Sequence, residues 1–158
     1  MSPTARRPHG RPTRRQLLAA GGLLALTMRP CAAQAMLEPE LRDAIGRWCN
    51  GAVPQTGRIT LDIAPLVENG NAVPVTLRVH SPMSATDHVR EIAMFNERNP
   101  LRDVVRFQLG PANGRAEVST RIRLATTQHL VALARLSDGS VWQHGLEVIV
   151  TLAACIES

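Results

Sequence analysis

The sequence predicts an all-β fold, an antiparallel β-sandwich preceded by one short helix. Three observations lead to this fold class. Helical spacing of apolar residues occurs only before residue 51, whereas apolar and polar residues alternate beyond Gly57. About seven short alternating runs follow one another, and clusters of Gly, Pro, Asn, Asp and Ser separate them. Residues 36–158 contain no internal repeat, and about 123 residues suit a single domain with one core.

The predicted helix covers residues 37–50. Gly51 follows it at a position where a helix end is expected. Cys49 lies late on this helix, and because cysteine commonly packs as a small buried hydrophobe, we expect it in the core. The apolar residues that share one helix face are Leu37, Leu41, Ala44, Ile45 and Trp48.

The first two predicted strands lie on either side of a turn. Ile59, Leu61 and Ile63 alternate with polar residues, which predicts a half-buried strand. Residues 68–71, Glu-Asn-Gly-Asn, predict a turn because Asn and Gly tolerate positive φ. Residues 73–79 then alternate again, and their second residue is a proline, which suits a strand start or an edge.

The remaining strands are predicted from further short runs at similar spacing, some of which alternate. The alternation is cleanest over residues 117–124, where Val, Thr, Ile and Leu share one face and Glu, Ser and Arg the other. Asn-Pro at 99–100, Gly-Pro at 110–111 and Ser-Asp-Gly-Ser at 137–140 separate neighbouring runs. The other predicted strands are residues 89–95, 104–109, 130–136, 141–142 and 148–152.

The first 35 residues have the pattern of a cleaved export signal. Residues 13–18, Thr-Arg-Arg-Gln-Leu-Leu, have the twin-arginine form, an apolar run follows over 17–28, and Ala33-Gln34-Ala35 is a small-x-small cleavage sequence. The run is too short to cross a bilayer, because twelve helical residues cover about 18 Å of a core of roughly 30 Å. An anchoring helix is disfavoured because the polar residues precede the apolar run. Lipid attachment at Cys31 is disfavoured because Met-Arg-Pro precedes it. The sequence predicts cleavage after Ala35 and twin-arginine export to the bacterial periplasm, with no membrane attachment afterwards.

The basic character of the chain lies in this signal. The chain has 18 basic and 13 acidic side chains and a pI near 10.8. Six arginines lie in residues 1–35, so residues 36–158 hold 12 basic and 13 acidic groups, a formal net charge of −1. Two Trp, two Phe and no Tyr offer little stacking surface for bases. We therefore expect no binding to nucleic acid.

The chain lacks the common enzyme signatures. It has no phosphate-binding glycine loop, no Gly-x-Ser-x-Gly elbow and no lysine, which excludes Schiff-base chemistry. The separations of His80, His88, His129 and His144 fit no common metal motif, so we interpret them as ordinary surface or turn histidines. The sequence predicts no catalytic residue, no metal and no cofactor.

Two cysteines remain after signal cleavage, Cys49 and Cys155. Cys155 follows the last predicted strand and lies three residues from the chain end, where cores rarely extend. A thiol on such a tail can reach into the cleft of another protein. The alternatives are a disulfide to Cys49 in the oxidising periplasm, or an accidental surface cysteine.

A series of short segments, in order and without large gaps, carries a family resemblance. They are residues 57–63 (Gly-Arg-Ile-Thr-Leu-Asp-Ile), 68–75 (Glu-Asn-Gly-Asn-Ala-Val-Pro-Val), 81–83 (Ser-Pro-Met), 99–100 (Asn-Pro), 107–111 (Phe-Gln-Leu-Gly-Pro), 119–125 (Ser-Thr-Arg-Ile-Arg-Leu-Ala) and 136–140 (Leu-Ser-Asp-Gly-Ser). From about residue 40 to the C-terminus, the sequence resembles the SoxY sulfur-carrier family. The resemblance implies an immunoglobulin-like sandwich over residues 36–152, pairing with a SoxZ-like subunit, and service to sulfur-oxidising periplasmic enzymes such as those of thiosulfate oxidation.

The resemblance also implies the role of the tail, residues 153–158, which we call the C-terminal arm. In SoxY a cysteine in this arm holds sulfur intermediates covalently, and the matching position here is Cys155. The family's arm reads Gly-Gly-Cys-Gly-Gly, whereas here Ala153, Ala154, Ile156 and Glu157 surround the cysteine, as in a SoxY-related group with an Ala-Ala-Cys-Ile-Glu arm. Alanine and β-branched isoleucine narrow the backbone options that glycine allows. Glu157 and the terminal carboxylate disfavour a nearby thiolate.

Three hypotheses follow. The first is a carrier without turnover of its own, whose Cys155 is the covalent attachment point. The second, motivated by the altered arm, is a structural or assembly module that binds a SoxZ-like partner and carries no sulfur. The third is a thiol-disulfide protein that uses Cys49 with Cys155.

Overall fold

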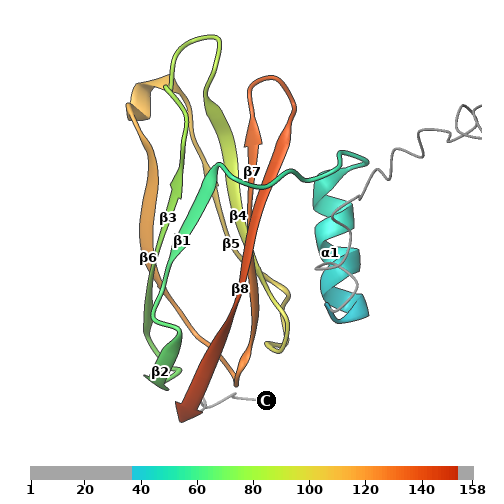
Figure 1. The fold of residues 1–158 in the computed structure, drawn as a ribbon, viewed down its shortest axis with the longest axis vertical. Helices are drawn as coiled ribbons and strands as arrows, with labels where there is room; N and C mark the ends of the chain where they lie inside the picture. Colours follow the sequence, from blue (N-terminus) through green and yellow to red (C-terminus); the bar gives the residue numbers. More distant parts are fainter. Residues whose placement is uncertain (1–36, 153–158) are drawn as a thin grey trace, which may run out of the picture. The chain divides into compact units, whose positions relative to one another are not determined.

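The computed structural model describes residues 37–152, and within them it contains two β-sheets and one α-helix (Figure 1). The predicted signal, residues 1–35, and the C-terminal arm lie outside the described residues. The order of strands is β1-β3-β6 in the three-stranded sheet and β2-β8-β7-β4-β5 in the five-stranded sheet. The elements are α1 (Pro39–Cys49), β1 (Ile59–Asp62), β2 (Leu66–Asn69), β3 (Val73–Val79), β4 (Val89–Asn96), β5 (Asp103–Gln108), a 3-10 turn η2 (Pro111–Asn113), β6 (Ala116–Ile122), β7 (Gln128–Leu136) and β8 (Val141–Leu152).

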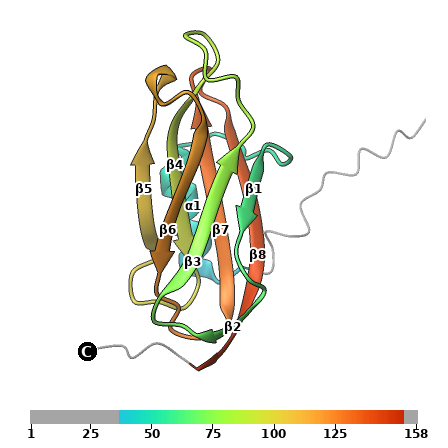
Figure 2. The same cartoon turned by 90° about the vertical axis from the view of Figure 1, so that its left-hand side faces the viewer.

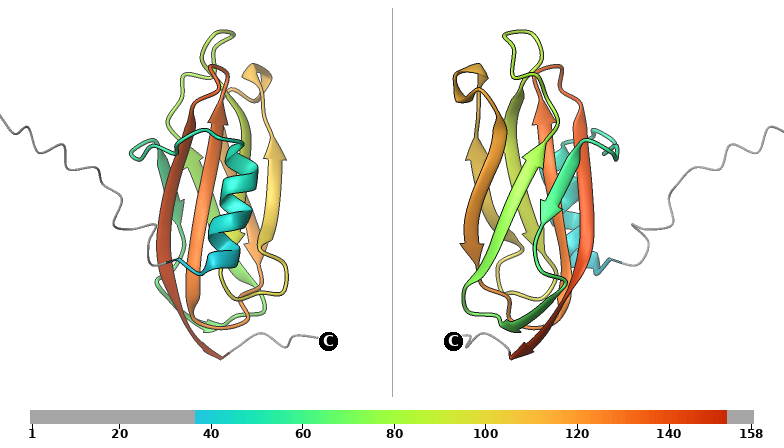
Figure 3. Two further views of the ribbon diagram at one scale, coloured as in Figure 1. Left: turned by 90° about the vertical axis from the view of Figure 1, so that its right-hand side faces the viewer. Right: turned by 60° about the vertical axis from the view of Figure 1, so that its left-hand side comes forward.

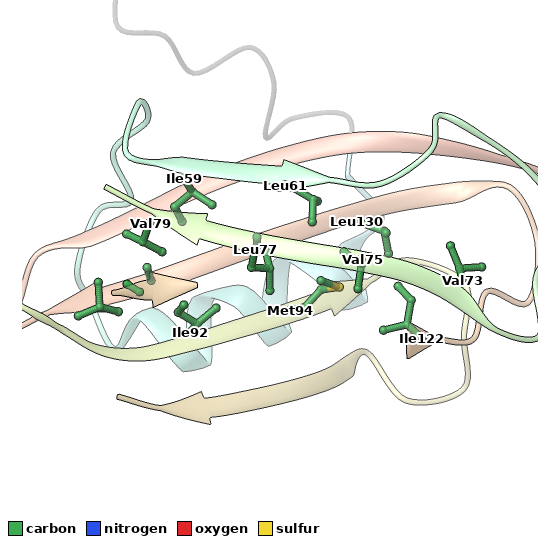
Figure 4. Close-up of a cluster of buried hydrophobic side chains, with 14 of the residues drawn as sticks. Ile59, Leu61, Val73, Val75, Leu77, Val79, Ile92, Met94, Ile122 and Leu130 are labelled. Carbon is green, nitrogen blue, oxygen red and sulfur yellow. The ribbon is translucent and has the colours of Figure 1, made fainter. Parts of the chain in front are cut away.

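The two sheets face each other across one hydrophobic core (Figures 2 and 4). On β3 the residues at alternate positions, from Val73 to Val79, are buried and the intervening ones are not. They pack against Ile92 and Met94 of β4 and Leu130 of β7, as Figure 4 shows. This arrangement confirms the predicted β-sandwich, because alternation on a strand places one residue in two between the sheets.

The helix α1 covers the outer face of the five-stranded sheet (Figure 3). It buries one face, including Leu41 and Trp48, against Phe95 and Leu133 of the sheet. Consequently the middle of β7 is buried on both sides, and its apolar residues form a continuous run instead of alternating. The helix ends where Asn50 adopts a left-handed conformation, with φ of 50°.

Two elements differ from those predicted. Residues 66–69 form β2, whereas the sequence predicts a turn that begins at Glu68; the observed turn begins at Gly70. β2 pairs parallel with β8, so this pair is an exception in an otherwise antiparallel fold. β8 is one strand of 12 residues, whereas two separate strands at its ends are predicted. No helix in residues 37–152 is long and apolar enough to cross a membrane.

Candidate functional site

The last described strand leads directly to the arm that carries Cys155. Pairing between β7 and β8 ends at Gln128 and Val148. β8 continues for four more residues, 149–152, beyond this pairing, and we call these residues the arm base. Figures 1 and 3 show the arm base leaving one end of the sandwich beside β2.

β2 fixes one side of the arm base. Leu66 lies opposite Ile149, and Asn69 lies opposite Leu152, in a parallel register. The Ile149 amide donates to the Pro65 carbonyl at 2.9 Å, and the Gly70 amide donates to the Leu152 carbonyl at 2.9 Å. The chain is therefore held by backbone hydrogen bonds as far as Leu152.

Thr127 fixes the other side of the arm base. The Val150 amide donates to the Thr127 hydroxyl oxygen at 3.0 Å. This hydroxyl stands where the backbone of β7 would continue, because β7 begins only at residue 128. A side chain thus extends the hydrogen bonding of the sheet by one position toward the arm.

The arm base has an apolar and exposed surface. Leu66 and Ile149 are 55% and 50% exposed, and they lie side by side on the outer face of the sheet because they are register partners. Leu152 is 62% exposed. The arm itself, with Ala153, Ala154, Cys155, Ile156 and Glu157, lies outside the described residues.

Cys49 is a buried free thiol, as the sequence predicts. It lies in the last turn of α1 and is only 4% exposed. Burial raises the pKa of the Cys49 thiol above its ordinary value, and the positive charge of Arg135 offsets part of this increase. A buried, protonated thiol is a poor nucleophile, so Cys49 is a packing residue.

The histidines form no metal-binding cluster in the described residues: no group of three or more His, Cys, Asp or Glu side chains there has the arrangement of a metal site. His129 has a role that the sequence analysis missed, since its backbone amide and Nδ1 both lie 3.1 Å from Oε2 of the buried Glu97. Burial acts to raise the pKa of Glu97, but the hydrogen bonds from His129 and the charge of Arg98 outweigh it and lower this pKa. A glutamate next to a turn carries no sequence signal for this contact, which spans 32 residues.

Comparison with known proteins agrees with this geometry. Residues 47–155 match the family described as sulfur oxidation protein SoxY. The solved structure of the sulfur carrier protein SoxY from Chlorobium limicola f thiosulfatophilum has a TM-score of 0.60 and 30% sequence identity, over 71% of this chain and 96% of that one. Among curated protein sequences, none matches this chain.

More distant structures share the fold alone. Superoxide reductase (neelaredoxin) from Ignicoccus hospitalis is 18% identical, with a TM-score of 0.53 over 60% of this chain and 80% of its own. A putative superoxide reductase from Thermotoga maritima is also 18% identical, with a TM-score of 0.52 over 61% and 93%. Identity at this level says nothing about a shared activity.

The fold and the arm base define a class of protein, a β-sandwich whose last strand continues past its neighbour β7 and is followed in the sequence by a segment with a cysteine. The family match extends over this sandwich and ends at Cys155. The chain belongs to the SoxY family.

Proposed function

We propose that this protein is a periplasmic sulfur carrier that holds sulfur intermediates covalently on Cys155 for sulfur-oxidising enzymes, including those of thiosulfate oxidation. The observation that carries the proposal is the family match, which runs to residue 155. The similar SoxY of Chlorobium limicola f thiosulfatophilum is itself described as a sulfur carrier protein. The twin-arginine pattern of residues 13–18 supports export to the periplasm.

The arm base supports this role through its anchoring. Hydrogen bonds hold the chain to Leu152, and Cys155 is three residues further along. Three extended residues span at most about 11 Å. The sulfur is therefore presented within a short radius of a fixed point, which lets a partner enzyme take in the cysteine while the sandwich stays outside.

The attachment chemistry requires a partner. When a Cys155 thiol joins thiosulfate, a sulfur–sulfur bond forms, the thiol releases one proton, and two electrons leave. An electron-accepting enzyme must take these electrons, because the proposed carrier has no cofactor and no catalytic residue of its own. The negative charge of Glu157 disfavours the free thiolate, so the partner must also activate the sulfur.

Mass spectrometry of the protein purified from its native periplasm tests the proposal. During growth on reduced sulfur compounds, we expect the arm peptide to carry sulfane, thiosulfonate or mixed-disulfide adducts on Cys155. Cys155→Ser removes these adducts, and the matched control Cys49→Ala keeps them. A Cys155 that never carries an adduct under these conditions would contradict sulfur carriage.

A second candidate is an assembly module that binds a SoxZ-like subunit without carrying sulfur. The departure of residues 153–157 from a diglycine arm favours it, because alanine and isoleucine restrict the backbone. The two candidates differ in one strain. If the protein is a carrier, Cys155→Ser abolishes sulfur oxidation. If it is an assembly module, Cys155→Ser leaves sulfur oxidation intact, and only deletion of the whole chain stops it.

The position of Cys49 argues against the thiol-disulfide hypothesis, because Cys49 packs in the same cluster as Val141 at the start of β8, whereas the arm base is the end of that strand. Trp48, next to Cys49, accepts a hydrogen bond from Arg135, which is the register partner of Val141 at the start of β8. The arm leaves from the other end of that strand. A bridge between Cys49 and Cys155 within one chain would require β8 to unravel.

A further inference from the structure

A groove of about 630 Å³ runs between α1 and the edge formed by β4 and β5. Figure 3 shows α1 lying over the five-stranded sheet with β5 beside it. The groove follows β4 from Glu91 to Phe95, which is about 13 Å at 3.3 Å per residue. Its volume lies in the range of ligand-binding clefts.

Positive charge dominates the lining of this groove. Four arginines line it, Arg47, Arg102, Arg106 and Arg135, against two carboxylates, those of Glu91 and Asp103. Guanidinium groups bind carboxylate and other oxyanions through paired hydrogen bonds.

Two of these arginines are already neutralised. Arg106 donates to Asp103 at 2.6 Å, and Arg102 forms an ion pair with Glu40 of α1. The Nε of Arg102 is buried without a hydrogen-bond partner among the described residues.

The other two arginines form no ion pair with a carboxylate in residues 37–152, although Glu91 is the register partner of Arg135. The Arg135 guanidinium contacts neutral groups. It donates a hydrogen bond to the Trp48 carbonyl, and its Cζ lies 4.5 Å from the centroid of the Trp48 ring. Arg47 is exposed in the last turn of α1 and forms no ion pair with any described residue. Glu91 accepts a hydrogen bond from the Trp48 indole and offsets one of these charges. The groove therefore keeps an excess of positive charge.

One end of the groove is lined by the loop after β4, whose last residue, Asn96, is the register partner of Leu130 near the start of β7. Residues 100–102 line its lower part, and Leu101 there is 77% exposed. The neighbouring Arg98 amide donates to Gln128, the register partner of Val148, where β8 passes beyond β7. This end of the groove therefore has an exposed apolar side chain, Leu101, and is linked through Arg98 and Gln128 to the residue that precedes the arm base.

We propose that this groove binds an extended acidic peptide segment of an enzyme that acts on the arm. The length of about 13 Å fits about four extended residues. A single small oxyanion would contact only part of it. The partner's identity as an arm-processing enzyme rests on the proposed sulfur-carrier function, whereas the acidic character of the segment rests on the groove alone. The contact would orient the enzyme so that its active site faces the arm.

The test uses the protein purified from its native host and the peptide Asp-Glu-Leu-Asp-Glu-amide with fluorescein on its N-terminal amine, with its Asn/Gln counterpart as control. Fluorescence anisotropy measures binding at several salt concentrations. We expect the acidic peptide to bind, the neutral peptide not to bind, and salt to weaken binding. Arg47→Gln should weaken binding roughly three- to fivefold, which corresponds to the upper end of the free energy that an exposed ion pair contributes. Arg47→Glu should weaken binding further.

Arg115→Gln is the matched control variant, because Arg115 lies next to β6 in the other sheet and its side chain is 81% exposed. It should bind the peptide as the unmodified protein does, and neither variant should change the melting temperature. Equal binding by the Arg47 and Arg115 variants would overturn the proposal. Displacement of the peptide by thiosulfate, but not by chloride at equal ionic strength, would also overturn it and identify a small-oxyanion site.

The proposed function is tested separately by Cys155. Cys155→Ser should bind the peptide normally, because the described residues that line the groove all lie between Ala44 and Arg135. Adducts on Cys155 without peptide binding would reject the groove proposal alone. Peptide binding without adducts would reject sulfur carriage alone.

Discussion

Oxidation of the two cysteines gives the sharpest test of the fold. Cys49 lies near the start of β8, and the arm leaves from its end, eleven residue steps away. At about 3.3 Å per step this strand is about 36 Å long. The arm adds a reach of about 11 Å, and a disulfide joins Cα atoms about 6 Å apart. A gap of about 20 Å remains, so we expect no bridge between Cys49 and Cys155 within one folded chain.

The assay is a thiol count on the protein after signal removal. In native buffer we expect one rapidly reacting thiol per chain, Cys155, because Cys49 is 4% exposed and burial raises its pKa. In denaturant both thiols react. Mild oxidation should give only dimers linked through Cys155, with a yield that rises with protein concentration. Cys49→Ala should behave identically, and Cys155→Ser should give no dimer. A peptide map showing Cys49 joined to Cys155 in a native monomer would refute the reasoning.

Three further changes test the packing and the arm base. Trp48→Ala should lower the free energy of unfolding by about 3–5 kcal/mol, measured by urea denaturation, because it empties the space under α1 and removes the Glu91 hydrogen bond. Thr127→Val should cost about 1 kcal/mol and speed amide exchange at Val150, which loses its acceptor; unchanged exchange would contradict the anchoring role. Glu97→Gln should flatten the dependence of stability on pH: the lowered pKa of Glu97 stabilises the fold above the ordinary glutamate pKa of 4.5, and this contribution is lost as pH falls through the lowered value. Chemical denaturation between pH 3 and pH 7, in steps, checks this last expectation.

The strands predicted correctly are those in which alternation is a local property. Residues 73–79 and 117–124 each carry one buried face, and the structure forms β3 and β6 there. The burial of Cys49 is also predictable, because helical spacing places it beside Trp48. In these places the sequence pattern and the tertiary contacts point the same way.

The arm base is not predictable from local pattern. β2 ends at Asn69, and the turn preference of Asn69-Gly70-Asn71 hides the preceding strand in the sequence pattern. The parallel partner of β2 in β8 is more than 80 residues away in the sequence. β8 is interrupted in the pattern by His144 and Gly145, although the strand continues through both. A Cβ on Gly145 would lie 3.5 Å from Leu130 O and from a Val131 methyl group, which are ordinary contacts, so packing does not require a glycine there. Long-range pairing, which the local sequence does not encode, decides both elements.

The parallel pairing of β2 with β8 has a mechanical consequence. In the proposed carrier, an enzyme that draws the arm into its active site would pull along the axis of β8. The bonds of Ile149 and Leu152 toward β2, and the bond of Val150 to Thr127 on the other side of β8, all lie across that axis, so they are loaded together in shear and do not peel apart one by one. A pull on the cysteine therefore stretches the short arm, while the sandwich resists as a unit and the tether keeps a constant length from one enzyme to the next.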